Sequence, residues 1–141
     1  MITTAISATV TWKDGNRFTG RSGSGYEIDV EEPSRTGVPG AGPSPAELAL
    51  IALGTCTGVV VAGVLVQSGE QLRGLQIEVE ATPLDTNSRG IGDIRLLYRV
   101  AGDVSGEKVE RAVDLSSDAL CILKDMLGAK AEIRQEFEIK N

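Results

Sequence analysis

The chain has 141 residues, a net charge of -6 and no histidine. This length suits one domain over residues 1–141 with a core of its own. The acidic balance argues against a nucleic-acid partner, because phosphate backbones are bound by clusters of Lys and Arg. The lack of histidine excludes Ser-His-Asp and Cys-His catalysis and every histidine-containing metal site. Acid–base or nucleophilic chemistry therefore depends on cysteine, carboxylates, lysine or arginine.

The two cysteines, Cys56 and Cys121, are too few to build a zinc site by themselves. The N-terminus shows no basic segment followed by an apolar stretch, which is the pattern of a signal peptide. We therefore expect a cytoplasmic protein whose thiols are reduced at rest.

The first third of the chain predicts an antiparallel meander. Residues 3–12 are rich in Thr, Val and Ile and predict a strand. Residues 13–16, Lys-Asp-Gly-Asn, predict a hairpin turn centred on Asp-Gly, with a short return strand at 17–20. A second turn is expected at residues 23–25, and the alternation over residues 26–30 predicts the third strand.

A loop rich in proline and glycine follows over residues 31–43. Glycine-rich loops that run into a helix can hold an anion. The Gly-Lys-Ser/Thr ending of a nucleotide-binding loop is missing, so a connector before a helix is the favoured interpretation.

Residues 44–69 carry several agreeing signals for a long helix. Ser44 is a capping residue, Pro45 suits the first helical position, and Glu47 completes a capping box with Ser44. Gly69 suits a left-handed helix stop.

This helix has no charged residue from Leu48 to Val66. A helix that is apolar on every side is expected to be buried on every side. The run also reaches the length of a membrane span, about 18 apolar residues. No basic cluster flanks it to set an orientation, and we favour a central helix wrapped by sheet and packed against a twin from a second subunit.

The remainder of the chain predicts mixed elements. Alternating apolar residues predict strands at 75–81, 93–101 and 132–140, the first with one solvated face. An amphipathic helix is expected to start at Ser105, and a further helical segment at 121–127. The order β-β-β-α-β-β-α-α-β predicts an α+β fold.

Cys56 and Cys121 are the candidates for chemistry, and their sequence context leaves two interpretations open. Buried cysteines commonly only fill a core. A functional pair requires the two sulfurs to meet, and a nearby cation to favour the thiolate over the thiol. Since the helix around Cys56 has no charge, the cation must come from another segment, such as Lys13 or Arg17.

The whole chain resembles the OsmC/Ohr family of osmotically inducible and organic hydroperoxide resistance proteins. The resemblance is clearest at residues 43–57, PSPAELALIALGTCT, which are similar to the helix signature of the family. The segments at 72–80, 109–116 with Cys121, and 131–133 are similar to the following strand, the second-cysteine segment and the last strand. Residues 10–15 and 25–30 fit the start of the family pattern.

The resemblance implies an OsmC-like fold, with antiparallel sheets wrapped around long central helices in an intertwined homodimer. It implies a thiol peroxidase in which Cys56 is the peroxidatic residue and Cys121 the resolving one. A dithiol reductant, of the lipoyl type in the best-known members, would restore the pair. No metal or flavin is required.

Three departures from the family pattern leave parts of the site open. Ala46 stands where organic hydroperoxide resistance proteins carry a glutamate, and Glu47 is either the Glu of the broader OsmC-like group or only a capping-box partner. Lys13 aligns with the family arginine, with Arg17 nearby as the other candidate cation. The apolar Leu-Cys-Ile-Leu context of Cys121 also differs, so a dimeric protein that binds a small hydrophobic ligand is the alternative function.

Overall fold

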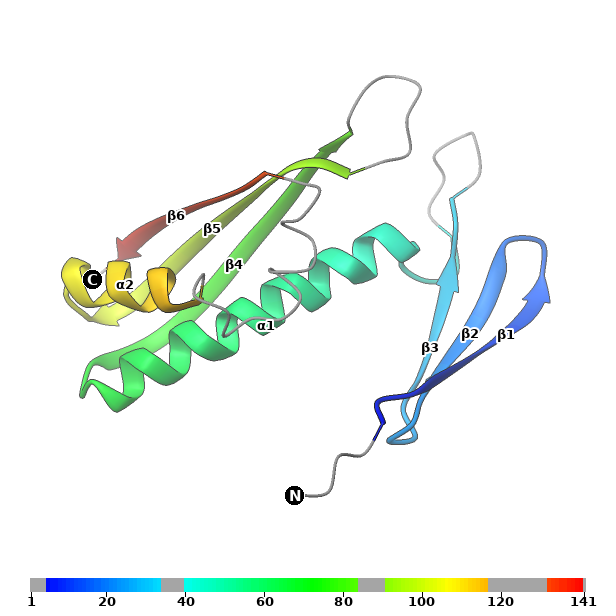
Figure 1. Ribbon diagram of the computed structural model, residues 1–141, viewed down its shortest axis with the longest axis horizontal. Helices are drawn as coiled ribbons and strands as arrows, with labels where there is room; N and C mark the ends of the chain where they lie inside the picture. The colour runs from blue at the N-terminus through cyan, green and yellow to red at the C-terminus, as the bar shows by residue number, and fades with distance from the viewer. Residues whose placement is uncertain (1–4, 34–39, 84–90, 117–131, 141) are drawn as a thin grey trace. The chain divides into compact units, whose positions relative to one another are not determined.

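The structure is a computed structural model that describes residues 5–33, 40–83, 91–116 and 132–140 (Figure 1). The chain divides into two compact units, residues 1–49 and 50–141. The described elements follow the predicted order, and the helical segment expected at 121–127 lies outside the described residues. The α+β fold class is confirmed.

The first unit contains the predicted antiparallel meander of β1 (Ala8–Asp14), β2 (Arg17–Ser22) and β3 (Glu27–Glu31). The strand β1 reaches one residue beyond the predicted start of the turn, so that the hairpin turn itself is Gly15 and Asn16. Gly15 has a φ of +46°, a left-handed conformation that glycine adopts without strain. The register of β1 shifts between Trp12 and Asp14, which places Lys13 at a bulge.

This sheet has one apolar and one polar face. Directly paired residues point to the same side of a sheet, and one such set consists of Val10, Trp12, Phe18, Ile28 and Val30. Several of these side chains are exposed, with Val10 at 66% and Trp12 at 62%. The opposite face carries the charged and hydroxyl side chains, including Arg17, Thr19 and Asp29.

Helix α1 (Pro45–Gln67) begins and ends where the sequence predicts. The amide of Glu47 donates to Ser44 Oγ at 3.1 Å, and the amide of Ser44 donates to Glu47 Oε1 at 3.0 Å, so the capping box is formed. At the other end, Gly69 has a φ of +79°, and the amide of Glu70 donates to the carbonyl of Leu65. This arrangement satisfies carbonyl groups that the last helical turn leaves free.

The second unit contains a sheet of β4 (Gln71–Pro83), β5 (Ile91–Asp103) and β6 (Ile133–Lys140). β4 and β5 are each longer than predicted and pair antiparallel. β5 and β6 pair parallel, which corrects the expectation of antiparallel sheets throughout. The reason is topological. Parallel pairing requires the chain to return to the end of the sheet at which β5 begins, and the connection that includes helix α2 provides this crossover.

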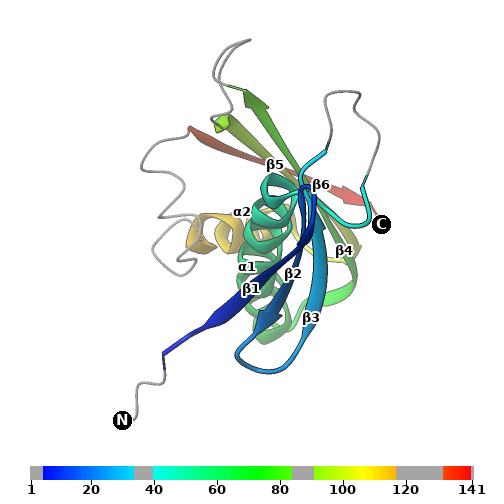
Figure 2. The same ribbon diagram turned by 90° about the vertical axis from the view of Figure 1, so that its right-hand side faces the viewer.

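Helix α2 (Gly106–Leu115) begins after Ser105, whose side chain accepts a hydrogen bond from the amide of Lys108. Its buried residues, Val109, Ala112 and Val113, pack into the hydrophobic core. Strand β5 contributes the central residues of this core, Ile94, Leu96, Tyr98 and Val100. Both helices lie on this apolar face of the sheet, α1 next to β4 and α2 next to β6 (Figures 1 and 2). The other face of the sheet is charged.

Candidate functional site

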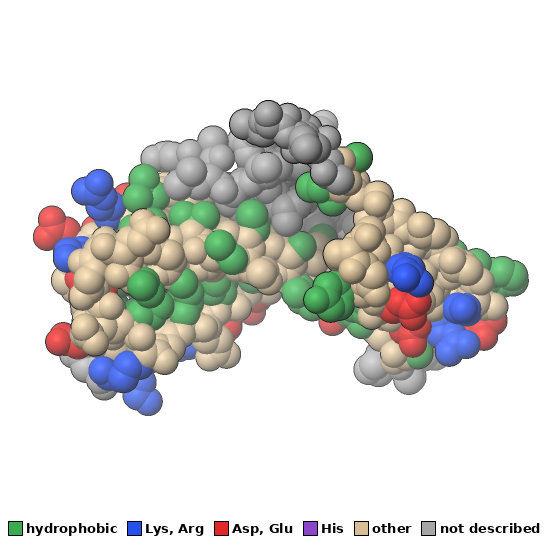
Figure 3. All heavy atoms as spheres, turned by 90° about the horizontal axis from the view of Figure 1, so that it is seen from below, with side chains coloured by type: hydrophobic (Ala, Val, Ile, Leu, Met, Phe, Trp, Pro, Cys, Tyr) green, Lys and Arg blue, Asp and Glu red, His purple; other side chains and the backbone are tan. Residues whose placement is uncertain are grey.

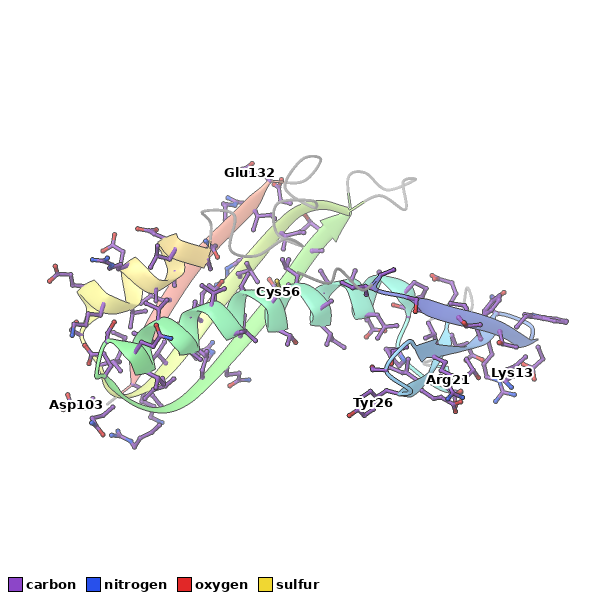
Figure 4. All side chains as sticks on the ribbon, turned by 60° about the horizontal axis from the view of Figure 1, so that its bottom comes forward. Lys13, Arg21, Tyr26, Cys56, Asp103 and Glu132 are labelled. Atoms are coloured by element: carbon purple, nitrogen blue, oxygen red, sulfur yellow. The ribbon has the colours of Figure 1, made fainter. Side chains whose placement is uncertain are left out.

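Cys56 lies near the middle of α1, on the border between its buried and exposed faces (Figure 4). Leu53 is fully buried, and three residues correspond to about 300° around a helix, so Cys56 is turned about 60° from that buried direction. Its half-buried neighbours one turn away are Ala52 and Val60. The thiol thus packs against the core and also keeps part of its surface accessible.

Two glycines let the same helix approach β4 closely. A Cβ atom on Gly54 would lie 3.0 Å from Val79 Cγ2, and one on Gly58 would lie 2.7 Å from Ile77 Cδ1. Two residues correspond to about 200° around a helix, so Cys56 faces away from this glycine row. Close packing against the sheet therefore fixes the direction in which the Cys56 side chain points.

The outer face of α1 corrects the expectation of burial on every side. Ile51, Val59 and Val66 are 58%, 69% and 61% exposed, and Thr55 lies between the first two on the same stripe. Apolar side chains on this side of the molecule are visible in Figure 3. The helix is long and apolar enough to cross a membrane by composition, and 28% of its most apolar stretch is buried.

Glu47 acts as the capping partner of Ser44. Of its two carboxylate oxygens, Oε1 accepts the Ser44 amide at the start of α1. This bond explains the presence of a Glu three residues after Ser44 without any catalytic role.

The two candidate cations, Lys13 and Arg17, belong to the first unit, and their surroundings differ sharply. Lys13 is exposed at the β1 bulge. Arg17 is only 38% exposed, and its Nη2 donates to Asp14 Oδ2 at 2.9 Å. Among the described residues, Arg17 Nε is a buried donor without a hydrogen-bond partner. Such a donor is rare in folded proteins and calls for an acceptor.

Sequence reasoning missed two features of the structure, one in each unit. Asp14 was assigned only to the turn, although its position across the hairpin from Arg17 makes it the carboxylate partner. A buried polar group formed by Tyr98, Ser116 and Gln135 was also missed, because its members are far apart in sequence and none is charged. A polar residue on the core face of the last strand, Gln135, was the available signal.

The remaining predicted residue, Cys121, lies outside the described residues. Within the described ranges, no three His, Cys, Asp or Glu residues gather closely enough to hold a metal ion.

A meander followed by a long helix, which presents a half-buried cysteine beside a mixed sheet, defines an α+β protein with a candidate thiol site. A family model described as OsmC-like protein matches residues 38–136. This chain therefore belongs to the OsmC-like family.

Comparison with known proteins supports this assignment over nearly the full length. The chain is 29% identical to Protein YhfA of Escherichia coli K12 over 135 residues, which cover 95% of this chain and 98% of that protein. Its fold is similar to that of an OsmC-like protein from Mycoplasma pneumoniae, with a TM-score of 0.83, 15% identity and coverage of 99% and 100%. It is also similar to the organic hydroperoxide resistance protein OhrB of Bacillus subtilis, with a TM-score of 0.70, 16% identity and coverage of 96% and 98%.

Proposed function

We propose that this protein is a thiol-dependent peroxidase that reduces organic hydroperoxides. Hydrogen peroxide is the second candidate substrate. The observation that carries the proposal is the half-buried Cys56 on the border of α1, in a member of the OsmC-like family. A thiol that is partly accessible can meet a small substrate, whereas a fully buried one is inert. Structural neighbours named as organic hydroperoxide resistance proteins support the substrate class.

The proposed chemistry balances with two thiols and one dithiol. The Cys56 thiolate attacks the peroxide oxygen and breaks the O–O bond, which leaves Cys56 as a sulfenic acid and expels an alkoxide. The alkoxide takes up a proton from solvent, equivalent to the one that the Cys56 thiol lost, and leaves as the alcohol. The Cys121 thiol then displaces the hydroxyl group as water and forms a disulfide with Cys56. An external dithiol, such as a lipoyl group, reduces this disulfide and becomes oxidised itself.

We favour Arg17 over Lys13 as the cation of this site. The planar guanidinium has several donors, and Asp14 fixes its orientation through Nη2 while Nε has no partner among the described residues. A thiolate or a peroxide oxygen would be a suitable acceptor for Nε. Lys13 offers only a flexible, exposed point charge.

The decisive experiment is consumption of cumene or tert-butyl hydroperoxide with a dithiol reductant. Cys56→Ser is expected to reduce the rate to that of the reductant alone, because the alcohol of serine does not attack the O–O bond. Cys121→Ser is expected to keep the first oxidation and to lose the disulfide. Equal rates for the wild type and Cys56→Ser would refute the proposal.

The second candidate is a binding protein for a small hydrophobic ligand. It is favoured by the apolar neighbourhood of Cys56, which packs against the hydrophobic core, and by the engagement of Glu47 in the helix cap. Mass spectrometry after mild peroxide treatment separates the two candidates. Formation of a Cys56–Cys121 disulfide supports the enzyme, whereas two unmodified thiols support the binding protein.

We also propose that the protein is a cytoplasmic homodimer. The exposed stripe of α1 and the exposed apolar face of the first sheet are the surfaces that a second copy would cover. We also propose that residues 1–141 form a single OsmC-like domain. Recovery in the soluble fraction without detergent would support a cytoplasmic protein over the membrane-span interpretation of α1.

A further inference from the structure

The hairpin between β1 and β2 contains a peptide bond that is prone to rearrangement, the bond between Asp14 and Gly15. Asp14 is the only aspartate of the chain that precedes a glycine. An aspartate side chain can reach neighbouring backbone nitrogens, and a following glycine has no Cβ to obstruct that approach. The other described aspartates precede valine, isoleucine or leucine, namely Asp29, Asp93, Asp103 and Asp114.

The structure leaves this turn open. The Asp14 side chain is 69% exposed. Gly15 has a φ of +46°, and apart from its chain neighbours no atom of the described residues lies within 4 Å of the point that a Cβ would occupy. The carboxyl group of Asp14 can therefore approach the Gly15 nitrogen without displacing packed side chains.

Two contacts hold the turn against this approach. Arg17 Nη2 donates to Asp14 Oδ2 at 2.9 Å, and Trp12 Nε1 donates to the carbonyl oxygen of Gly15 at 3.0 Å. An attack on Asp14 Cγ has to pull the carboxylate away from the guanidinium. The ion pair with Arg17 therefore opposes a reaction that the sequence favours.

We propose that Asp14 is a site of spontaneous conversion to isoaspartate and that its ion pair with Arg17 restrains this reaction. The Gly15 nitrogen bonds to Asp14 Cγ, while one carboxylate oxygen takes up the N–H proton and a solvent proton and leaves as water. Water then adds to the main-chain carbonyl carbon of the succinimide ring, breaks its bond to the Gly15 nitrogen and releases a proton. The product has the composition of the starting protein, and no reagent besides water takes part.

Isomerisation changes the geometry of the turn. The main chain becomes one carbon longer, and the carboxylate sits on an arm that is one carbon shorter. The carboxylate is thereby displaced from Arg17, and the Gly15 carbonyl from Trp12. Since Trp12 is the only tryptophan of the chain, its fluorescence reports the change.

The first test follows the folded protein during incubation at neutral pH below its unfolding temperature. Digestion with endoproteinase Asp-N, which cleaves before aspartate but not before isoaspartate, is expected to lose the cut at Asp14 faster than the cut at Asp29. Asp14→Glu keeps a carboxylate but would have to form a larger, less favourable ring, so it is expected to keep its Trp12 fluorescence unchanged. Retention of the Asp14 cut for as long as the Asp29 cut would overturn the inference.

The second test removes the restraint. Arg17→Gln is expected to raise the rate of isoaspartate formation about 1.5- to fivefold, the range for an exposed ion pair. Arg21→Gln removes a cation from the same strand and face, where Arg21 lies 3.7 Å from Glu27, and is expected to leave the rate unchanged. An unchanged rate in Arg17→Gln, or an equal increase in both variants, would overturn the restraining role.

One consequence rests on the proposed function, because Arg17 is the cation proposed for the peroxidase. Incubated wild type is expected to lose peroxidase rate in proportion to its isoaspartate content, while Asp14→Glu keeps its own starting rate. An unchanged rate would overturn the part that Asp14 plays in orienting Arg17. If fresh wild type consumes no hydroperoxide, the peroxidase is refuted, and the Asp-N digest still decides whether isoaspartate forms at Asp14.

Discussion

Glu47 shows how one side chain can satisfy a structural and a chemical pattern at once. Its carboxylate closes the capping box at the start of α1, and the family resemblance assigns a glutamate to the same neighbourhood. A cap needs only an acceptor oxygen, which an amide also provides. An ion pair with a cation needs the charge, so a glutamine at this position separates the two roles.

Glu47→Gln is therefore expected to keep the unfolding free energy within about 0.5 kcal/mol, whereas Glu47→Ala is expected to lose about 1 kcal/mol through the cap. Denaturant unfolding of the two variants checks this difference. We expect Glu47→Gln to slow peroxide consumption if the charge orients Arg17. A rate equal to that of the wild type would remove Glu47 from the site and leave it as a cap.

The two glycines beside Cys56 give a second prediction at the residue scale. Alanine gains about 1 kcal/mol over glycine in a helix, but here its Cβ would meet the sheet. On Gly58 the obstacle is Ile77 Cδ1, the end of a side chain that can rotate away, whereas on Gly54 it is a methyl group of the stiffer Val79.

Gly54→Ala is thus expected to destabilise the protein by about 1–3 kcal/mol, and Gly58→Ala is expected to be close to neutral. Thermal or denaturant unfolding of both variants shows which substitution lowers the unfolding free energy more. The reverse order would contradict the packing of α1 against β4 described above.

At the scale of elements, the sequence predicts what depends on local patterns. The capping box at Ser44 and the stop at Gly69 are properties of a few adjacent residues, and both are confirmed. The first hairpin turn is also local, but it lies at Gly15 and Asn16, one residue later than the predicted Asp-Gly centre, because Asp14 pairs with Arg17. The direction in which β6 pairs is not local, because it depends on the path of the chain through α2. Strand lengths were underestimated for β4 and β5 because cross-strand pairing extends them past the apolar alternation.

The same distinction applies to the candidate site. The position of Cys56 on a long helix follows from the apolar run, but the face on which it lies depends on which side of α1 packs on the sheet. A helix that is apolar all round has no polar stripe to mark that side. The partner of Arg17 depends on the hairpin register, which places Asp14 directly across from it.

The outer face of the second sheet combines ion pairs with packing. Arg99 contacts Glu78 at 3.0 Å and Glu138 at 2.6 Å, while Arg95 contacts Glu80 and Glu136. Leu97 lies between these arginines on the same strand and face, yet is only 4% exposed. The aliphatic stems of the charged side chains therefore cover it.

Arg99→Met should retain most of this cover and lose the ion pairs, whereas Arg99→Ala loses both. We expect Arg99→Ala to lower the unfolding free energy more than Arg99→Met does. Added salt should reduce the difference between the wild type and Arg99→Met, because it screens exposed ion pairs. Urea unfolding at low and high salt checks both; equal losses in the two variants would mean that the stem contributes nothing.

Salt is a better probe of this network than alkaline pH. The hydrogen bond to Glu78, followed by the charges of Glu138 and Glu78, raises the pKa of Arg99 above its ordinary value. A raised pKa in the folded state stabilises the protein below the unfolded pKa and is lost only as pH rises through the folded pKa. For an arginine that loss falls in strongly alkaline solution, so it does not affect stability near neutral pH.

At the scale of the whole molecule, the exposed stripe of α1 is the feature that most requires a partner. Ile51, Val59 and Val66 place large apolar groups in water along a helix of 23 residues. A row of large exposed apolar side chains on one helix face is typical of an interface in soluble proteins. In the homodimer proposed above, a second copy would cover this stripe.

Val59→Glu is expected to convert a dimer into monomers, because closing the interface would bury a carboxylate without a partner. Light scattering after size-exclusion chromatography should give twice the 14.8 kDa of one chain for the wild type and the single value for the variant. Gln67→Glu adds the same charge at an exposed position at the end of the helix and is expected to remain dimeric. A wild-type monomer, or a dimer that survives Val59→Glu, would show that this stripe is not the dimer interface.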